Sequence, residues 1–191
     1  MLRSILLFGT LLAVSLPAFA AVEKYEIDPN HTQVRFTWNH FGFSNPGAML
    51  ENVRGAIMLD TADLTKSSVS VTIPLSGIDT GVDKLDEHLK AADFLDAAKY
   101  PDITFKSTKV EKAGTDKLAV TGDLDVHGVS RPVTLQVRIN KIGENKMIAS
   151  KSAGFDAEVV LKRSDFGVDK YVPAVSDAIH VHITVSANLA K

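Results

Sequence analysis

Apolar and polar residues alternate along most of the chain, which is the pattern of β-strands that bury one face. In the segment QVRFTWN, residues 33–39, the side chains of Val34, Phe36 and Trp38 share one face. The same alternation recurs in SVSVTIPL, TFKSTKV, KLAVTGDLDVHG, PVTLQVRI, GFDAEVVLK and AIHVHITVSANL. The short segments YEID and RGAIMLD are also expected to be strands. The pattern predicts a mainly β protein of roughly eight to ten strands.

Short polar segments separate these strands, which favours antiparallel neighbours because parallel crossovers need a dozen or more residues. One-sided strands in this number must bury their apolar faces together, as a sandwich or as a closed barrel. A barrel of about eight strands has room inside for side chains or for one small ligand. The inward-facing positions carry scarcely a charge. The interior is therefore either a filled core or a dry pocket, and both readings fit the pattern.

One segment has the period of an amphipathic helix rather than a strand. Over residues 82–98, Leu85 and Leu89 form an apolar stripe that Leu95 extends, and acidic residues lie in the first turns. Pro101 ends this segment, because the residue before a proline is pushed out of the helical region. The sequence predicts one helix over residues 82–98, followed directly by a strand over residues 102–110.

The first 20 residues have the pattern of a cleaved signal peptide. Arg3 supplies a positive charge, residues 5–16 are apolar, and Ala18 and Ala20 form the small-x-small pattern that signal peptidase recognises. The apolar run is too short for a spanning helix. We expect cleavage after Ala20 and a single exported domain over residues 21–191, without an integral membrane segment and located most simply in the bacterial periplasm.

Charge and composition narrow the function classes. The formal net charge is −2 and the isoelectric point about 6.3, so nothing in the charge indicates a nucleic acid partner. The chain contains no cysteine, which excludes thiol catalysis and cysteine–zinc sites.

Residues with catalytic potential have simpler structural explanations. His180 and His182 share the polar face of the last predicted strand, but two ligands on one strand are an incomplete metal site. Ser130 follows Gly128 in the stretch HGVSRP, which is typical of a hairpin turn. We therefore predict no catalytic residue, no metal site and no cofactor.

Four stretches resemble a known family, in the order expected for it. They are YEIDPNHTQVRFTWNHFGFS, HLKAADFLDAAKYPDITFKSTKV, VTGDLDVHGVSRPVTLQV and LKRSDFGVD, and the resemblance covers Tyr25 to Leu189. The sequence is similar to the YceI-like family, whose fold is an extended eight-stranded antiparallel, lipocalin-like barrel with a helix packed against it. Some members bind a polyisoprenoid or related long-chain amphiphile in an apolar tunnel. Homodimers occur in the family, so the resemblance also allows a homodimer here.

The resemblance implies a periplasmic carrier for an isoprenoid-like lipid, with a quinone as one candidate. The tunnel lining expected from strand facing and family position is Phe36, Trp38, Phe43, Phe94, Phe105, Leu124, Phe155, Phe166, Val181 and Ile183. Asn39, His40 or Arg54 would bind the headgroup at the mouth. The helix over residues 82–98 would cover the tunnel, with Leu89, Phe94 and Leu95 pointing inward.

Two other function classes remain open at the level of sequence. An interaction or stress-related protein with a filled barrel would contain no cavity and would carry no lipid. An enzyme or redox accessory that acts on quinones, or that uses His180 and His182 with a metal, would contain stoichiometric metal or lose activity on His180→Ala.

Overall fold

The computed structural model describes residues 22–191. The predicted signal peptide and its cleavage site after Ala20 lie outside these residues. Within them the chain forms one antiparallel sheet of eleven strands and a single α-helix, α1 (Asp83–Lys90). The strands are β1 (Glu23–Ile27), β2 (Gln33–Thr37), β3 (Gly47–Leu50), β4 (Arg54–Leu59), β5 (Ser68–Pro74), β6 (Ile78–Asp79), β7 (Asp102–Lys112), β8 (Lys117–Val126), β9 (Val129–Asn145), β10 (Ser150–Lys162) and β11 (Ala178–Leu189).

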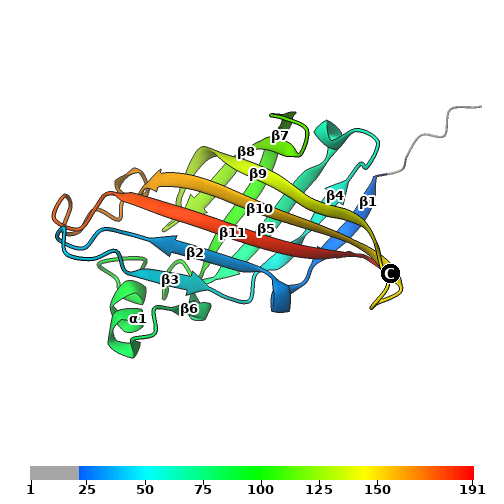
Figure 1. Ribbon diagram of the computed structural model, residues 1–191. Coiled ribbons are helices and arrows are strands. Elements are labelled where there is room, and N and C mark those ends of the chain that lie inside the picture. The colour runs from blue at the N-terminus through cyan, green and yellow to red at the C-terminus, as the bar shows by residue number, and fades with distance from the viewer. Residues whose placement is uncertain (1–21) are drawn as a thin grey trace, which may run out of the picture.

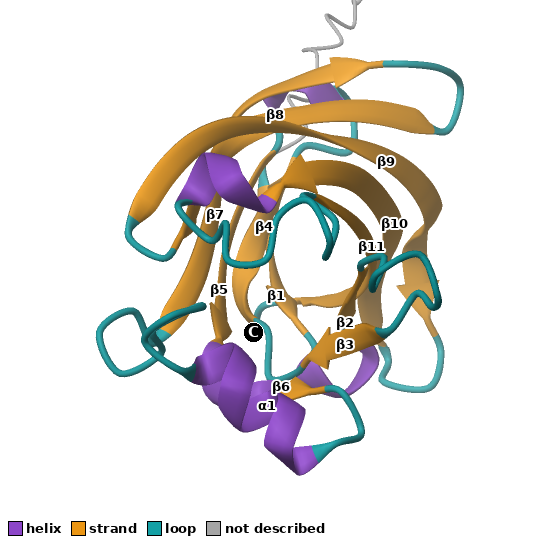
Figure 2. Ribbon diagram, turned by 90° about the vertical axis from the view of Figure 1, so that its left-hand side faces the viewer, coloured by secondary structure: helices purple, strands orange, loops and turns teal. Residues whose placement is uncertain are grey.

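The sheet closes on itself because β1 pairs with both β4 and β11. β1 and β2 pair with successive parts of β11, so together they act as one long interrupted strand. β3 and β4 continue one another in the same way beside β2 and β1, and β6 continues β5. The eleven segments thus make eight long strands that follow one another in chain order around the ring, as Figure 2 shows along its axis. The predicted eight-stranded antiparallel barrel is confirmed.

The interruptions arise from residues that cannot continue a strand. A 3-10 turn over Pro29–His31 separates β1 from β2, and the Asp28 carboxylate accepts a hydrogen bond of 3.0 Å from the Asn30 N–H. Between β3 and β4, Asn52 adopts a left-handed backbone conformation (φ +60°). Within β4, Gly55 has φ +149°, and a Cβ atom there would fall 2.1 Å from the Ser70 carbonyl oxygen. Glycine at this position therefore allows the close approach of β4 to β5.

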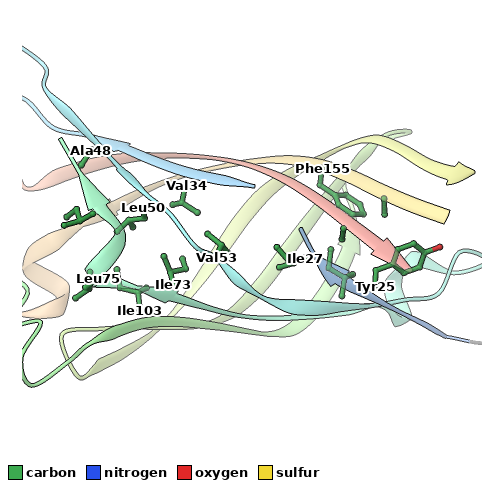
Figure 3. Close-up of a cluster of buried hydrophobic side chains, with 14 of the residues drawn as sticks. Tyr25, Ile27, Val34, Ala48, Leu50, Val53, Ile73, Leu75, Ile103 and Phe155 are labelled. Carbon is green, nitrogen blue, oxygen red and sulfur yellow. The ribbon is translucent and has the colours of Figure 1, made fainter. Parts of the chain in front are cut away.

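The two ends of the barrel differ (Figure 1). One end, which we call the helix end, carries α1, loop 38–46, the turn at residues 127–128 and loop 167–177. The opposite end, which we call the terminal end, carries the C-terminus and the start of β1. There the side chains of Tyr25 and Ala187 are fully buried, and Leu59 is 2% exposed. Figure 3 shows Tyr25, Ile27 and Phe155 gathered inside the barrel toward this end.

The helix is shorter than the sequence predicts. The prediction of helix over residues 82–98 is wrong beyond Lys90, because Ala91 is extended (φ −68°, ψ 161°) and the chain folds back on α1. The N–H groups of Leu95 and Ala97 donate to the carbonyls of Leu89 and Lys90, at 3.1 and 3.0 Å, which satisfies the end of the helix through a compact turn. The strand predicted after Pro101 is confirmed, since β7 begins at Asp102.

Helical segments in the described part of the chain are all short. None of those within residues 22–191 has both the length and the apolar character needed to cross a membrane.

Candidate functional site: an apolar cavity inside the barrel

The barrel encloses a cavity of about 600 Å³, a volume typical of sites for small ligands. Its wall is built from the inward-facing side chains of the strands, which period-2 alternation places on one face. Val181 and Ile183 on β11, for example, lie in the lining beside their strand partners Val159 and Ala157 of β10. Nearly every lining group is apolar, so the site offers burial rather than hydrogen bonds to a ligand.

Nine of the ten residues expected from the sequence to line a tunnel lie around this cavity. They are Phe36, Trp38, Phe94, Phe105, Leu124, Phe155, Phe166, Val181 and Ile183.

Phe43 is the exception, and its expected place in the lining is wrong. Its side chain is 91% exposed and lies in loop 38–46, beyond the end of β2 at Thr37. Phe41 (φ +53°) and Gly42 (φ +76°) both adopt left-handed backbone conformations that break the alternation of β2. The strand period therefore does not extend to Phe43, which projects into solvent.

The structure places the three expected headgroup residues in different environments. His40 lines the cavity, but Asn39 does not. The Asn39 side chain instead stabilises its own loop, donating to Asn45 Oδ1 at 3.0 Å and accepting from the Gly42 N–H at 2.7 Å. Arg54 is exposed, because it has the opposite facing to the inward residues Ile57 and Leu59 of β4. Asn39 and Arg54 are thus not placed to bind a headgroup inside the barrel.

The segment over residues 83–100 covers part of the helix end. Leu89, Phe94 and Leu95 line the cavity, as the sequence predicts for a cover. The ring of Phe94 meets His88 edge-on at 4.7 Å between centroids and lies 6.1 Å from the ring of Tyr171. The compact turn after α1 thus connects this segment with loop 167–177.

Several lining residues escape sequence reasoning because they belong to loops. Phe41, Tyr171 and Val175 line the cavity at the helix end. Phe41 and Tyr171 are half exposed, at 50% and 51%, so each faces both the cavity and the solvent. These residues mark the mouth of the cavity, and no periodic pattern in the sequence identifies them.

Arg163 holds the loop that carries Tyr171. Its guanidinium donates to three backbone carbonyls, those of Val168 (2.7 Å), Ser176 (2.9 Å) and Val175 (3.0 Å). Partial burial lowers the pKa of Arg163 by penalising its charged form, while the nearby Asp177 opposes that effect. A cation that bonds to three carbonyls of one loop fixes the shape of the mouth on this side.

Gly122 makes room for one of the lining aromatics. A Cβ atom at this position of β8 would fall 2.6 Å from the ring of Phe105 and 2.5 Å from the carbonyl oxygen of Lys106. The Phe105 side chain therefore packs over the backbone of β8, which a larger residue at position 122 would prevent.

The histidines of the last strand lie away from the cavity lining. His182 Nδ1 is 3.3 Å from a carboxylate oxygen of Glu158, and both side chains are exposed. Within residues 22–191, no group of three or more His, Asp or Glu side chains is arranged to hold a metal ion.

Comparison with known sequences identifies a family. The sequence profile of the YceI-like domain matches residues 25–187. Protein YceI of Escherichia coli O6:H1 is 36% identical over 180 residues, which span 94% of this chain and 93% of that protein.

Solved structures share the fold. The YceI protein of Campylobacter jejuni is 32% identical, with a TM-score of 0.74 over 80% of this chain and 90% of its own. A polyisoprenoid binding domain from Saccharophagus degradans, implicated in plant cell wall breakdown, superposes with a TM-score of 0.68 over 87% of this chain and 98% of its own. At 15% sequence identity, this second likeness concerns the fold alone.

Proposed function

Since the chain belongs to the YceI-like family and encloses an apolar cavity, we propose that it binds a long-chain isoprenoid or similar amphiphilic lipid inside its barrel. The observation that carries the proposal is the cavity of about 600 Å³ with its almost wholly apolar wall. The polyisoprenoid binding domain from Saccharophagus degradans, which has the same fold, supports this class of ligand.

Burial of a hydrocarbon chain supplies the binding free energy in this proposal. Each enclosed methylene contributes about 0.8 kcal/mol, so ten of them contribute about 8 kcal/mol. That gain is comparable to the estimated cost of association, about 4–15 kcal/mol. The headgroup stays at the helix end, near His40 and the half-exposed Tyr171. Binding and release require no catalytic step.

The proposal extends to location and cargo. The signal pattern of residues 1–20 supports export to the periplasm, where a soluble carrier could hold a chain that water alone does not dissolve. A quinone is one candidate, because its isoprenoid tail would fill the barrel. An interaction protein with a filled barrel is the second candidate function, and the cavity volume argues against it.

Native mass spectrometry of the protein purified without detergent, followed by organic extraction, tests the proposal. We expect a discrete added mass that extracts as a long-chain lipid, or uptake of added polyprenol or quinone by the bare protein. A protein that is bare and takes up neither compound would overturn lipid binding and leave a surface function in its place.

A further inference from the structure

Four large apolar side chains are exposed around the mouth of the cavity. Phe43 is 91% exposed, Tyr171 51%, Phe41 50% and Val172 37%. We call these four residues the aromatic rim. They lie on loops 38–46 and 167–177, which are far apart in the sequence and adjacent at the helix end (Figure 1). Contiguous exposed apolar groups of this kind mark interaction surfaces.

The two loops form one connected platform. The Phe41 N–H donates to the Ala174 carbonyl at 2.9 Å, and the Ser176 N–H donates to the Asn39 carbonyl at 2.9 Å. The Asn39 N–H donates in turn to the Ser176 hydroxyl, also at 2.9 Å. Arg163 fixes loop 167–177 through its hydrogen bonds to three backbone carbonyls. Because backbone hydrogen bonds hold both loops, the aromatic rim is presented in a set geometry.

The loop that carries Phe41 and Phe43 favours contact with an apolar phase. Residues 36–50, which include all of loop 38–46, contain no Asp, Glu, Lys or Arg. Loop 167–177 carries Asp169, which is exposed, and Lys170, which is paired with Asp93. Entry of Phe41 and Phe43 into a membrane interface would therefore bury no charged side chain from their own loop, which would otherwise be costly.

The aromatic rim is also continuous with the cavity. Phe41 and Tyr171 belong both to the exposed rim and to the cavity wall, so these two side chains link the outer surface with the barrel interior. We propose that the aromatic rim docks on the surface of a lipid bilayer and directs the cavity mouth at it. Aromatic side chains are favoured at the interface between membrane and water. The proposed docking depends only on the aromatic rim. A role of this docking in lipid transfer rests on the proposed function.

The barrel offers a matched control at its other end. Met147, in the turn between β9 and β10, is 93% exposed, almost the same as Phe43. It lies at the terminal end, does not line the cavity, and is flanked by Lys146. Met147→Ser removes an equally exposed apolar side chain at the terminal end, away from the proposed docking surface.

Flotation with phosphatidylcholine vesicles tests the docking. We expect the wild type and Met147→Ser to float with the vesicles, and Phe43→Ser to bind at least about tenfold more weakly, because one buried phenyl group accounts for a factor of that order. Binding should change little between low and high salt, since loop 38–46 carries no charge to screen. Failure of the wild type to float, or equal loss in both variants, would overturn the proposal.

Two further measurements separate docking from lipid binding and from self-association. Uptake of a polyprenol delivered from cyclodextrin, without vesicles, should be the same in Phe43→Ser and wild type. If both fail to take up the polyprenol while the wild type still floats, the proposed function fails and docking stands. Sedimentation equilibrium should give one oligomeric state for both proteins. A dimer that Phe43→Ser dissociates would assign the aromatic rim to a second copy and overturn docking on a bilayer.

Discussion

The ring of Tyr100 lies so close to the backbone of Gly128 that a Cβ atom on Gly128 would fall 2.3 Å from Tyr100 Cε1. The same ring meets His127 edge-on, at 5.0 Å between centroids. His127 and Gly128 form the turn between β8 and β9 and both have positive φ, +54° and +73°. This contact fixes segment 83–100, which covers part of the helix end, to the turn between β8 and β9. Tyr100 can do this because it lies where that segment joins β7.

Gly128→Ala should destabilise the protein by about 2–5 kcal/mol. About 1–2 kcal/mol comes from the left-handed backbone conformation, and the rest from displacement of the Tyr100 ring by the new methyl group. Gly81→Ala is the matched control, because Gly81 has nearly the same φ, +76°, and a Cβ atom there would have no other atom within 4 Å. Urea unfolding of both variants measures the difference, and equal losses would show that the Tyr100 contact contributes nothing.

Phe94→Asp should weaken retention of a bound lipid by several-fold or lower the stability of the fold. The new carboxylate would stand in the cavity wall beside Tyr171, where burial penalises its charge. The dissociation rate of a fluorescent long-chain lipid and the unfolding midpoint are the two readouts. Val82→Asp, at an exposed position before α1 that does not line the cavity, should change neither. Unchanged retention and stability in Phe94→Asp would contradict the role of this segment as a cover.

Ala157→Phe should reduce lipid uptake by filling the cavity from within. Ala157 lines the cavity on β10, between Val137 of β9 and Ile183 of β11. A phenyl group there would occupy space available to a ligand, so the variant should bind less lipid with an unfolding temperature close to that of the wild type. Ala119→Phe, on a residue of β8 that does not line the cavity, is the control. If Ala157→Phe binds as much lipid as the wild type, the ligand lies elsewhere.

Asp177 should make the stability of the mouth depend on pH. The Ser164 N–H (2.9 Å) and hydroxyl (2.7 Å) donate to its carboxylate and, with the charge of Arg163, hold the pKa of Asp177 below its ordinary value of 3.8. A carboxyl whose pKa is lower in the folded state stabilises the fold above about pH 4 and loses that contribution as pH falls through the folded pKa.

Asp177→Asn should therefore be less stable than the wild type at pH 7, by about 1 kcal/mol for the weakened hydrogen bonds. The difference in unfolding temperature should narrow as the pH falls from 5 to 2, because the wild type loses the same contribution on protonation. A difference that stays constant over this range would show that the Asp177 carboxylate does not carry it.

Period-2 alternation predicts most of the barrel because inward side chains face the apolar interior and outward side chains face water. Ile179, Val181 and Ile183 of β11 follow it without interruption. The same counting fails where the backbone enters the left-handed region, at Phe41 and at Tyr171 (φ +66°). There the side-chain direction no longer follows from sequence spacing, so the mouth of the cavity could not be assigned from the sequence.

The end of the helix and the cavity itself needed the structure for other reasons. Leu95 lies three residues after Ala92, a spacing that suits a continued helix, but its N–H bonds to the Leu89 carbonyl in a turn that folds back, and tertiary packing selects the turn. Whether inward side chains fill a barrel or leave a void depends on strand tilt and on how the side chains interlock. A list of apolar positions contains neither quantity.

The pairing of β1 with β11 has a consequence for how the protein matures. Residues 187–189 are the partners of residues 25–27, so the ring joins nearly the first described residue to nearly the last. Contacts of such large sequence separation form slowly, because a long loop must be closed before they contribute any stability. A growing chain has all its other strands before it has an enclosed interior. Under the proposed function, the barrel can therefore enclose a ligand only after β11 has been synthesised.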